Sequence, residues 1–164
     1  MELSTNSTNI TKSVSEEDRK RPVEIIQYIV IRLGDEQYGI DIRNIDTITR
    51  MQHITRVPKM PAYLKGVINL RGVVIPVMSM RLRMNLAADE ITKSTRIIVL
   101  KLEQEGNVGF IVDEVKEVVS LDVEDIEKIA DNNKEGKASL INAVGKHNGE
   151  LISLFDLNAI SLEG

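Results

Sequence analysis

Side chains that could carry out chemistry are few in this sequence. Its two histidines, His53 and His147, lie far apart along the chain, and neither has a second histidine or a cysteine near it. A histidine base and a metal-binding imidazole both depend on partner groups close by. We therefore interpret both histidines as solvated residues of connecting segments, with neither a catalytic nor a metal-binding role.

Carboxylates are numerous, but they occur in clusters. Residues 113–117 and 122–127 contain three and four Asp or Glu residues. Such clusters are typical of solvated faces and of turn caps. No isolated pair of carboxylates stands out as a general acid and its base, so the clusters do not predict hydrolytic chemistry.

A partial match to a calcium-binding loop begins at Asp131. Asp131, Asn133, Glu135 and Gly136 occupy its first, third, fifth and sixth positions, but the twelfth position is Asn142. A calcium loop of this type places a bidentate Glu at the twelfth position and has a helix on each side. The flanking sequence here predicts a loop and a strand, so we interpret the segment as a polar loop.

Motifs for phosphate binding and for nucleophilic catalysis are missing. Gly136-Lys137 and Gly145-Lys146 lack the earlier glycine and the following Ser or Thr of a phosphate-binding loop. The sequence has no G-x-S-x-G, H-E-x-x-H or G-x-G-x-x-G, and no cysteine for a thiolate or a zinc site. It therefore predicts no catalytic residue, no metal and no cofactor, and favours a protein that binds other proteins.

Composition and charge restrict the class of partner. The 164 residues are 42% hydrophobic and 28% charged, which is typical of a soluble domain. A net charge of −4 and an aromatic content of 3% disfavour nucleic acid as a partner. No apolar run approaches the roughly 18 residues of a membrane helix, and the first 20 residues lack the apolar stretch of a signal peptide. We expect a cytoplasmic protein that is not inserted in a membrane.

The elements that position these residues are expected to be strands. Residues 1–22 are polar and predict a flexible tail, whereas 23–164 predict a single domain. Short β-branched runs recur about every ten residues and are separated by glycine and polar turns, which favours two small antiparallel barrels. Short helical turns are expected at 79–86 and 123–129. The expected strands lie at 25–33, 38–40, 66–70, 73–78, 96–102, 108–112, 115–121, 140–144 and 151–155.

One apolar series has a helical spacing. Ile42, Ile45 and Ile48 recur every three residues, as on one face of a helical turn. Such a stripe can pack in the core or face a partner in a groove, and the pattern leaves both interpretations open.

Several segments resemble the CheW family of chemotaxis adaptors. The resemblance covers essentially residues 25–160, and it is carried by YGIDI at 38–42, GVINLRGVVIPV at 66–77, VGFIVDEV at 108–115, and VGK at 144–146 with LISLFD at 151–156. It implies an all-β fold of two packed five-stranded SH3-like barrels with a shared hydrophobic core. It also implies that the chain has no catalytic residue and no cofactor.

The resemblance implies partners as well. CheW-like adaptors couple the tips of methyl-accepting chemoreceptors to the histidine kinase CheA, whose regulatory domain has the same fold and alternates with the adaptor in rings. This chain would then be monomeric alone and assembled in arrays. By position, the receptor-binding groove between the barrels would involve Ile29, Ile42, Ile45 and Ile48, with Arg71 near by. The alternative is that Arg71 is a hairpin-turn residue that is solvated or packed along its stem.

The sequence departs from the family pattern at a few positions. Thr47 stands where an acidic residue is common, and Ser79 replaces the Asp of the usual Asp-Leu-Arg, which bears on receptor preference. The segment 130–140 lacks the usual aromatic entry to the last hairpin. Two related alternatives are an adaptor of a non-chemotactic signalling array and a piece of a CheV-type protein, whose receiver domain would not fit in this length. A third alternative, a ligand-binding or hydrolytic β-barrel, lacks a convergent polar site in the sequence.

Overall fold

The computed structural model describes residues 23–129 and 140–160. The predicted tail and most of the partial calcium loop lie outside these residues. The strands are β1 (Ile25–Leu33), β2 (Glu36–Asp41), β3 (Ile45–Arg50), β4 (Leu64–Leu70), β5 (Val73–Ser79), β6 (Arg96–Leu102), β7 (Gly106–Val112), β8 (Glu114–Asp122), β9 (Ile126–Lys128), β10 (Ile141–His147) and β11 (Glu150–Phe155). Short helical elements are η1 (Ile42–Asn44), α2 (Met80–Arg83), η2 (Val123–Asp125) and η4 (Leu157–Ala159).

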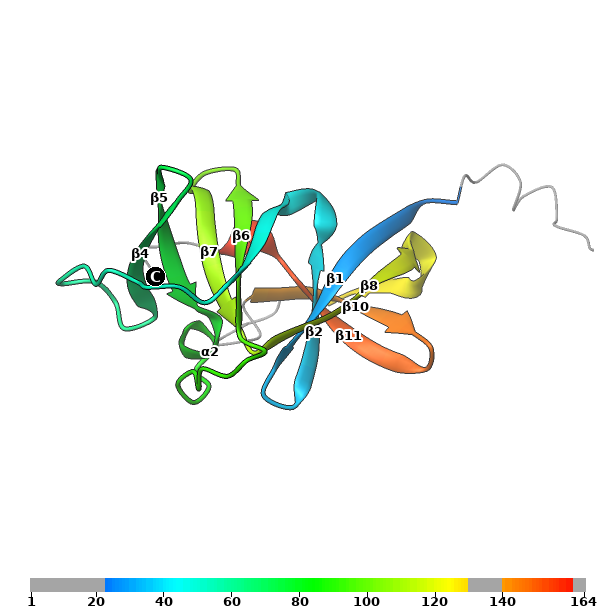
Figure 1. Cartoon of the computed structure of the whole chain (residues 1–164). Coiled ribbons are helices and arrows are strands. Elements are labelled where there is room, and N and C mark those ends of the chain that lie inside the picture. Colours follow the sequence, from blue (N-terminus) through cyan, green and yellow to red (C-terminus); the bar gives the residue numbers. More distant parts are fainter. Residues whose placement is uncertain (1–22, 130–139, 161–164) are drawn as a thin grey trace, which may run out of the picture.

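Two lobes lie side by side, one on each sheet (Figure 1). The first sheet has the order β3-β6-β7-β5-β4, and we call this lobe the central barrel. The second has the order β8-β1-β2-β11-β10-β9, and we call it the terminal barrel because it contains the first and the last strands. The described part of the chain therefore begins in the terminal barrel, crosses to the central barrel after β2, and returns after β7.

The terminal barrel is built around two hairpins. β1 and β2 are joined at Gly34, and β10 and β11 are joined at Asn148-Gly149, whose φ angles of +50° and +79° are those of a tight hairpin turn. β2 and β11 pair in parallel and unite the two hairpins. Its interior is filled by Tyr28, Val30, Val119, Leu121, Ala143, Ile152 and Leu154.

The central barrel is closed by the segment that follows β3. Thr55 and Val67 exchange two backbone hydrogen bonds of 2.8 Å, which join this segment to β4. β5 and β7 pair in parallel within the sheet. Its interior is filled by Ile68, Ile75, Val77, Ile97, Val99 and Ile111.

The largest core lies between the barrels and not inside either of them. Alternate residues of β1 and β6 point into a barrel and into the seam between the barrels, so both faces of these strands are buried. Phe110 of β7 is fully buried in this seam core, and the rings of Tyr38 and Phe155 stack at 5.2 Å within it. Burial of both faces explains why the sequences of β1 and β6 are almost continuous runs of apolar residues.

The predicted fold of two small packed barrels is confirmed, with three corrections. Each sheet contains one parallel pair, and the terminal sheet has a sixth strand, the three-residue β9. The helical turn expected at 79–86 is limited to α2, and the one expected at 123–129 becomes strand after η2. The pairing differs because each barrel brings together strands from distant parts of the chain, which local patterns do not encode.

Candidate protein-binding site

Four isoleucines lie along the edge of the seam core. Ile29 is 8% exposed and belongs to that core, Ile42 and Ile45 are half-buried against it, and Ile48 is 36% exposed. We call these four residues the seam strip. Ile29 comes from the terminal barrel and Ile48 from the central barrel, so the strip spans both lobes.

The expected helical face at Ile42, Ile45 and Ile48 is wrong for most of its length. Only Ile42–Asn44 forms a 3₁₀ turn, and Ile45–Arg50 is a strand. The three side chains nevertheless lie on one side of the seam, and their spacing has a different cause.

A β-bulge in β3 produces the spacing of three residues. Ile45 lies opposite Leu100 of β6, and Ile48 lies opposite Ile98, with a register shift at Asp46. An extra residue in one strand shifts the alternation of its faces by one position. Because Leu100 and Ile98 both point into the seam core, Ile45 and Ile48 share that face.

The turn that carries Ile42 is held by an ion pair. Asp41 Oδ1 accepts a hydrogen bond of 2.9 Å from the Arg43 backbone N, and Arg43 Nη2 lies 2.7 Å from Asp41 Oδ2. Burial alone would raise the pKa of Asp41, but the hydrogen bonds and charge of Arg43 outweigh it and hold that pKa below its ordinary value. Asp41 therefore stays ionised at neutral pH and caps the turn.

Val118 extends the strip and was not predicted. Antiparallel pairing of β1 and β8 places Val118 opposite Ile29, so both side chains lie on the outer face of the terminal sheet. Val118 is 50% exposed. The strip therefore continues as apolar surface onto β8.

Arg71 lies on a hairpin turn of the central barrel. It occupies the turn between β4 and β5 with a φ of +54°, its side chain is exposed, and Asn69 Oδ1 accepts a 3.0 Å hydrogen bond from the Gly72 N in the same turn. Ile45 and Ile48 are on β3, which pairs with β6, whereas Arg71 follows β4, which pairs with β5.

Chemical groups outside the strip are dispersed. His53 is exposed, and His147 Nε2 lies 3.3 Å from Asn148 Nδ2. Across 23–129 and 140–160, no group of three or more His, Cys, Asp or Glu side chains could hold a metal ion. Within the same ranges, no helix has the length and apolar character needed to cross a membrane.

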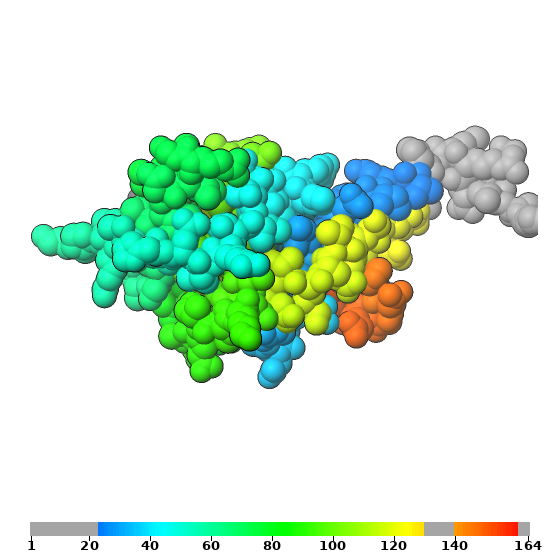
Figure 2. Space-filling model, viewed as in Figure 1, coloured from blue at the N-terminus to red at the C-terminus, as the bar shows by residue number. Residues whose placement is uncertain are grey.

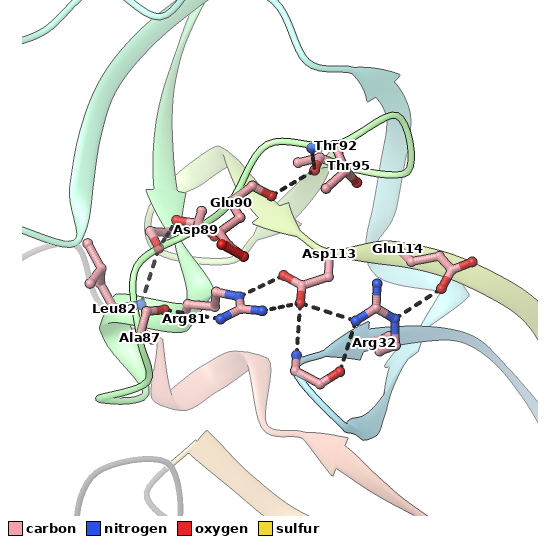
Figure 3. Close-up of polar contacts among 12 residues, drawn as sticks. Arg32, Arg81, Leu82, Ala87, Asp89, Glu90, Thr92, Thr95, Asp113 and Glu114 are labelled. Atoms are coloured by element: carbon pink, nitrogen blue, oxygen red, sulfur yellow. Dashed lines mark hydrogen bonds and ion pairs between the residues drawn. The ribbon is translucent and has the colours of Figure 1, made fainter.

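A buried carboxylate lies between the barrels (Figure 3). Asp113 accepts hydrogen bonds from Arg81 Nε at 2.8 Å, from Arg81 Nη2 at 2.5 Å and from the Gly34 N at 2.8 Å. Arg32 Nη1 lies 3.5 Å from the same carboxylate, and Arg32 Nε donates to Glu114 at 3.0 Å. We call Asp113, Arg81, Gly34 and Arg32 the crossing cluster.

Comparison with known proteins settles the family. A family model described as a CheW-like domain matches residues 27–163. The chain belongs to the CheW family. Chemotaxis protein CheW of Bacillus subtilis is 36% identical over 132 residues, covering 80% of this chain and 84% of that protein. The CheW of Helicobacter pylori is 36% identical over 141 residues, covering 84% and 82%.

A solved structure agrees with this assignment. The crystal structure of the scaffolding protein TtCheW from Thermoanaerobacter tengcongensis matches with a TM-score of 0.75 and 28% identity, covering 81% of this chain and 90% of that chain. The protein is thus a chemotaxis adaptor of the CheW type, with the double-barrel fold of that family.

Two of the three departures from the CheW pattern, Thr47 and Ser79, lie within the described residues, and neither is part of the strip. Thr47 is half-buried opposite Val99, whose side chain fills the interior of the central barrel, so Thr47 does not share the face of the strip. Ser79 is fully buried, and its hydroxyl donates to Asp89 Oδ2 at 2.5 Å. A carboxylate from the following loop therefore lies beside the position where the CheW family usually has Asp.

Val118 and the crossing cluster are the features that sequence reasoning missed in this CheW protein. Asp113 lies 81 residues from Arg32 in sequence and 32 from Arg81. In the sequence, Asp113 was noted only as one of the clustered carboxylates of residues 113–117. The VDEV resemblance at 112–115 marked the position without indicating these partners.

The pKa of Asp113 predicts a pH-dependent contribution to stability. Burial raises this pKa, but hydrogen bonds from Arg81 and Gly34 N and the charges of Arg81 and Arg32 outweigh burial and lower it. A carboxyl whose pKa is lower in the folded state stabilises the protein above its unfolded pKa of about 3.9, and this contribution is lost as pH falls through the folded pKa.

The Asp113→Asn variant tests this pH-dependent contribution of Asp113 to stability. At pH 7 it should be less stable than the wild type by about 1.5–3 kcal/mol, because hydrogen bonds to a charged group are lost. Urea denaturation should show the difference shrinking below about pH 4, where the carboxyl of the unfolded wild type begins to take up a proton, until the folded carboxyl is protonated as well. A difference that stays constant from pH 7 to pH 3 would contradict the assignment.

Proposed function

We propose that this CheW-type adaptor uses the seam strip to bind the tip of a chemoreceptor and also binds the histidine kinase CheA, so that receptor state reaches the kinase. It would act in the cytoplasm as a binding protein without catalysis, monomeric alone and assembled with its partners in arrays. The observation that carries the proposal is the gradient of exposure from Ile29 to Ile48 along the junction of the barrels.

The strip has the chemistry of a site for an amphipathic helix. Its members are aliphatic, and the β1–β8 pairing adds Val118 beside Ile29. A receptor tip is a helical hairpin, and its apolar ridge could lie along such a surface. A fully buried Ile contributes on the order of 1.5–3 kcal/mol, and Ile48 retains the most surface to bury of the four.

Substituting the most exposed member of the strip tests the receptor contact. Ile48→Asp should weaken binding of a soluble receptor-tip fragment by about tenfold or more, since it places a charge in an apolar contact. Ile91→Asp is the matched control, because Ile91 is 59% exposed in a loop outside the strip. Titration calorimetry would measure both, after thermal melts show that both variants fold.

The possible results of this titration distinguish an error in the location of the receptor site from an error in the adaptor role. If Ile48→Asp binds the receptor fragment as the wild type does, the seam strip is not the receptor site. If the wild type binds neither the receptor fragment nor the CheA regulatory domain, the adaptor role in this pathway is wrong. Retention of CheA binding by Ile48→Asp would show that the receptor contact alone was removed.

Val118 provides a second, independent prediction. Val118→Asp should also weaken receptor binding severalfold, because Val118 continues the strip on the terminal barrel. Leu151→Asp is its control, since Leu151 is 65% exposed on the same barrel but on β11. Equal effects of the two variants in the same titration would show that the strip ends at Ile29.

A further inference from the structure

The chain returns from the central to the terminal barrel through one residue. Asp113 is the only residue between β7, which ends at Val112, and β8, which begins at Glu114. Its side chain is 10% exposed. A carboxylate this deeply placed at a crossing point is expensive to bury unless its lone pairs are used.

Its hydrogen-bond donors come from both barrels. Arg81, in α2 directly after β5 of the central barrel, donates to both carboxylate oxygens. Gly34 N and Arg32, from the β1–β2 hairpin of the terminal barrel, approach the oxygen Oδ2. Arg32 Nη1 also donates to Gly34 O at 2.9 Å, and the Asp113 backbone N donates to Arg32 O at 3.1 Å. Figure 3 shows the carboxylate between the two arginines.

The crossing cluster adds directional contacts to the seam core. Apolar burial has no directional preference of its own, so in the seam core the angle between the barrels depends on how the side chains pack. A bidentate arginine–carboxylate pair has a defined geometry, and here the same carboxylate is also fixed to a backbone N–H of the other barrel.

We infer that Asp113 is a positioning residue that sets the relative orientation of the two barrels and thereby the geometry of the seam strip. Ile29 and Arg32 lie three residues apart on β1, about 10 Å along a strand. Ile45 and Ile48 lie on the central barrel, so a change in the inter-barrel angle moves them relative to Ile29. The inference rests on the proposed function only in its consequence for receptor binding.

The orientation can be measured without any partner. The chain has no cysteine, so Val73→Cys on β5 and Lys146→Cys on β10 would place one spin label on each barrel, both at exposed positions. Double electron–electron resonance then reports the distance distribution between the labels. Asp113→Asn removes the charged carboxylate that donors of both barrels share, and Arg81→Gln removes the bidentate donor of the central barrel. Glu114→Gln is the matched control, because the partner of Glu114 is Arg32 on the same barrel.

Asp113→Asn and Arg81→Gln should broaden or shift the distance distribution, whereas Glu114→Gln should leave it unchanged. Arg81→Lys should restore it in part, since it retains the charge but not the bidentate geometry. Distributions for Asp113→Asn and Arg81→Gln that superpose on the wild type would overturn the inference. If one of these variants does not fold, the other decides the result.

Receptor affinity gives a second measurement. If the binding-competent orientation falls to about a tenth of the population, affinity should fall about tenfold in Asp113→Asn. A shifted distance distribution with unchanged affinity would overturn the link to the strip. Absence of receptor binding by the wild type would defeat the proposed function and leave the distance result to decide the role of Asp113.

Discussion

Gly66→Ala is expected to destabilise the protein by about 3 kcal/mol or more, because the added methyl group meets backbone and not a movable side chain. Gly66 has a φ of +143°, and a Cβ there would lie 2.1 Å from the Thr55 carbonyl oxygen. That oxygen accepts the Val67 N–H in the bridge that closes the central barrel. The added methyl group therefore interferes with the Thr55–Val67 bridge that closes the central barrel.

Gly72→Ala is the control for this prediction. Gly72 also has a positive φ, +83°, but nothing lies within 4 Å of the position that a methyl group would take there. Its substitution should cost only the conformational strain, on the order of 1 kcal/mol. Urea denaturation would compare the two, and equal losses would mean that closure at Thr55 and Val67 tolerates the methyl group.

Phe110→Ala is expected to cost about 3–5 kcal/mol, the usual range for deleting a fully buried ring. Phe110 is 0% exposed and lies in the seam core, opposite Ile98 of β6 and Met78 of β5. Among the described residues the seam core holds more buried side chains than the two barrel interiors together. The barrels should therefore unfold in one transition in the wild type, and that transition should move to lower denaturant in Phe110→Ala.

Val74→Ala provides the comparison, because Val74 is 64% exposed and should change stability by about 0.5 kcal/mol or less. Two separate unfolding transitions in the wild type, with Phe110→Ala altering only one, would show that each barrel is stable without the seam. Fluorescence is weak in a chain with no tryptophan, so circular dichroism is the suitable probe. Figure 2 shows the close contact of the lobes that this prediction assumes.

Local pattern was sufficient for most strands and turns. β-branched runs predicted β1 and β6, and Asn148-Gly149 predicted the last hairpin, because strand propensity and turn chemistry depend on neighbouring residues. The family motifs extended this to the double barrel. The lack of cysteine and of catalytic motifs already favoured a binding protein at that level.

The site was predicted in part. Ile42, Ile45 and Ile48 were singled out by a spacing of three, which pointed to a helical face. The residues do share a face, but the cause is the bulge at Asp46, which is defined only by the register of β3 against β6. Val118 was missed for the same reason, since its place beside Ile29 depends on the pairing of β1 with β8.

The sequence by itself thus determined most of the strands and turns and, through the family motifs, the kind of protein, but not β3 or β9. Tertiary structure alone decided that the first and last hairpins share a barrel, that the main core lies between the barrels, and that Asp113 joins Arg81 to Gly34. The physical reason is the range of the interactions. Propensity acts over a few residues, whereas sheet register, burial on both faces of a strand and the partners of a buried carboxylate depend on segments far apart in the chain.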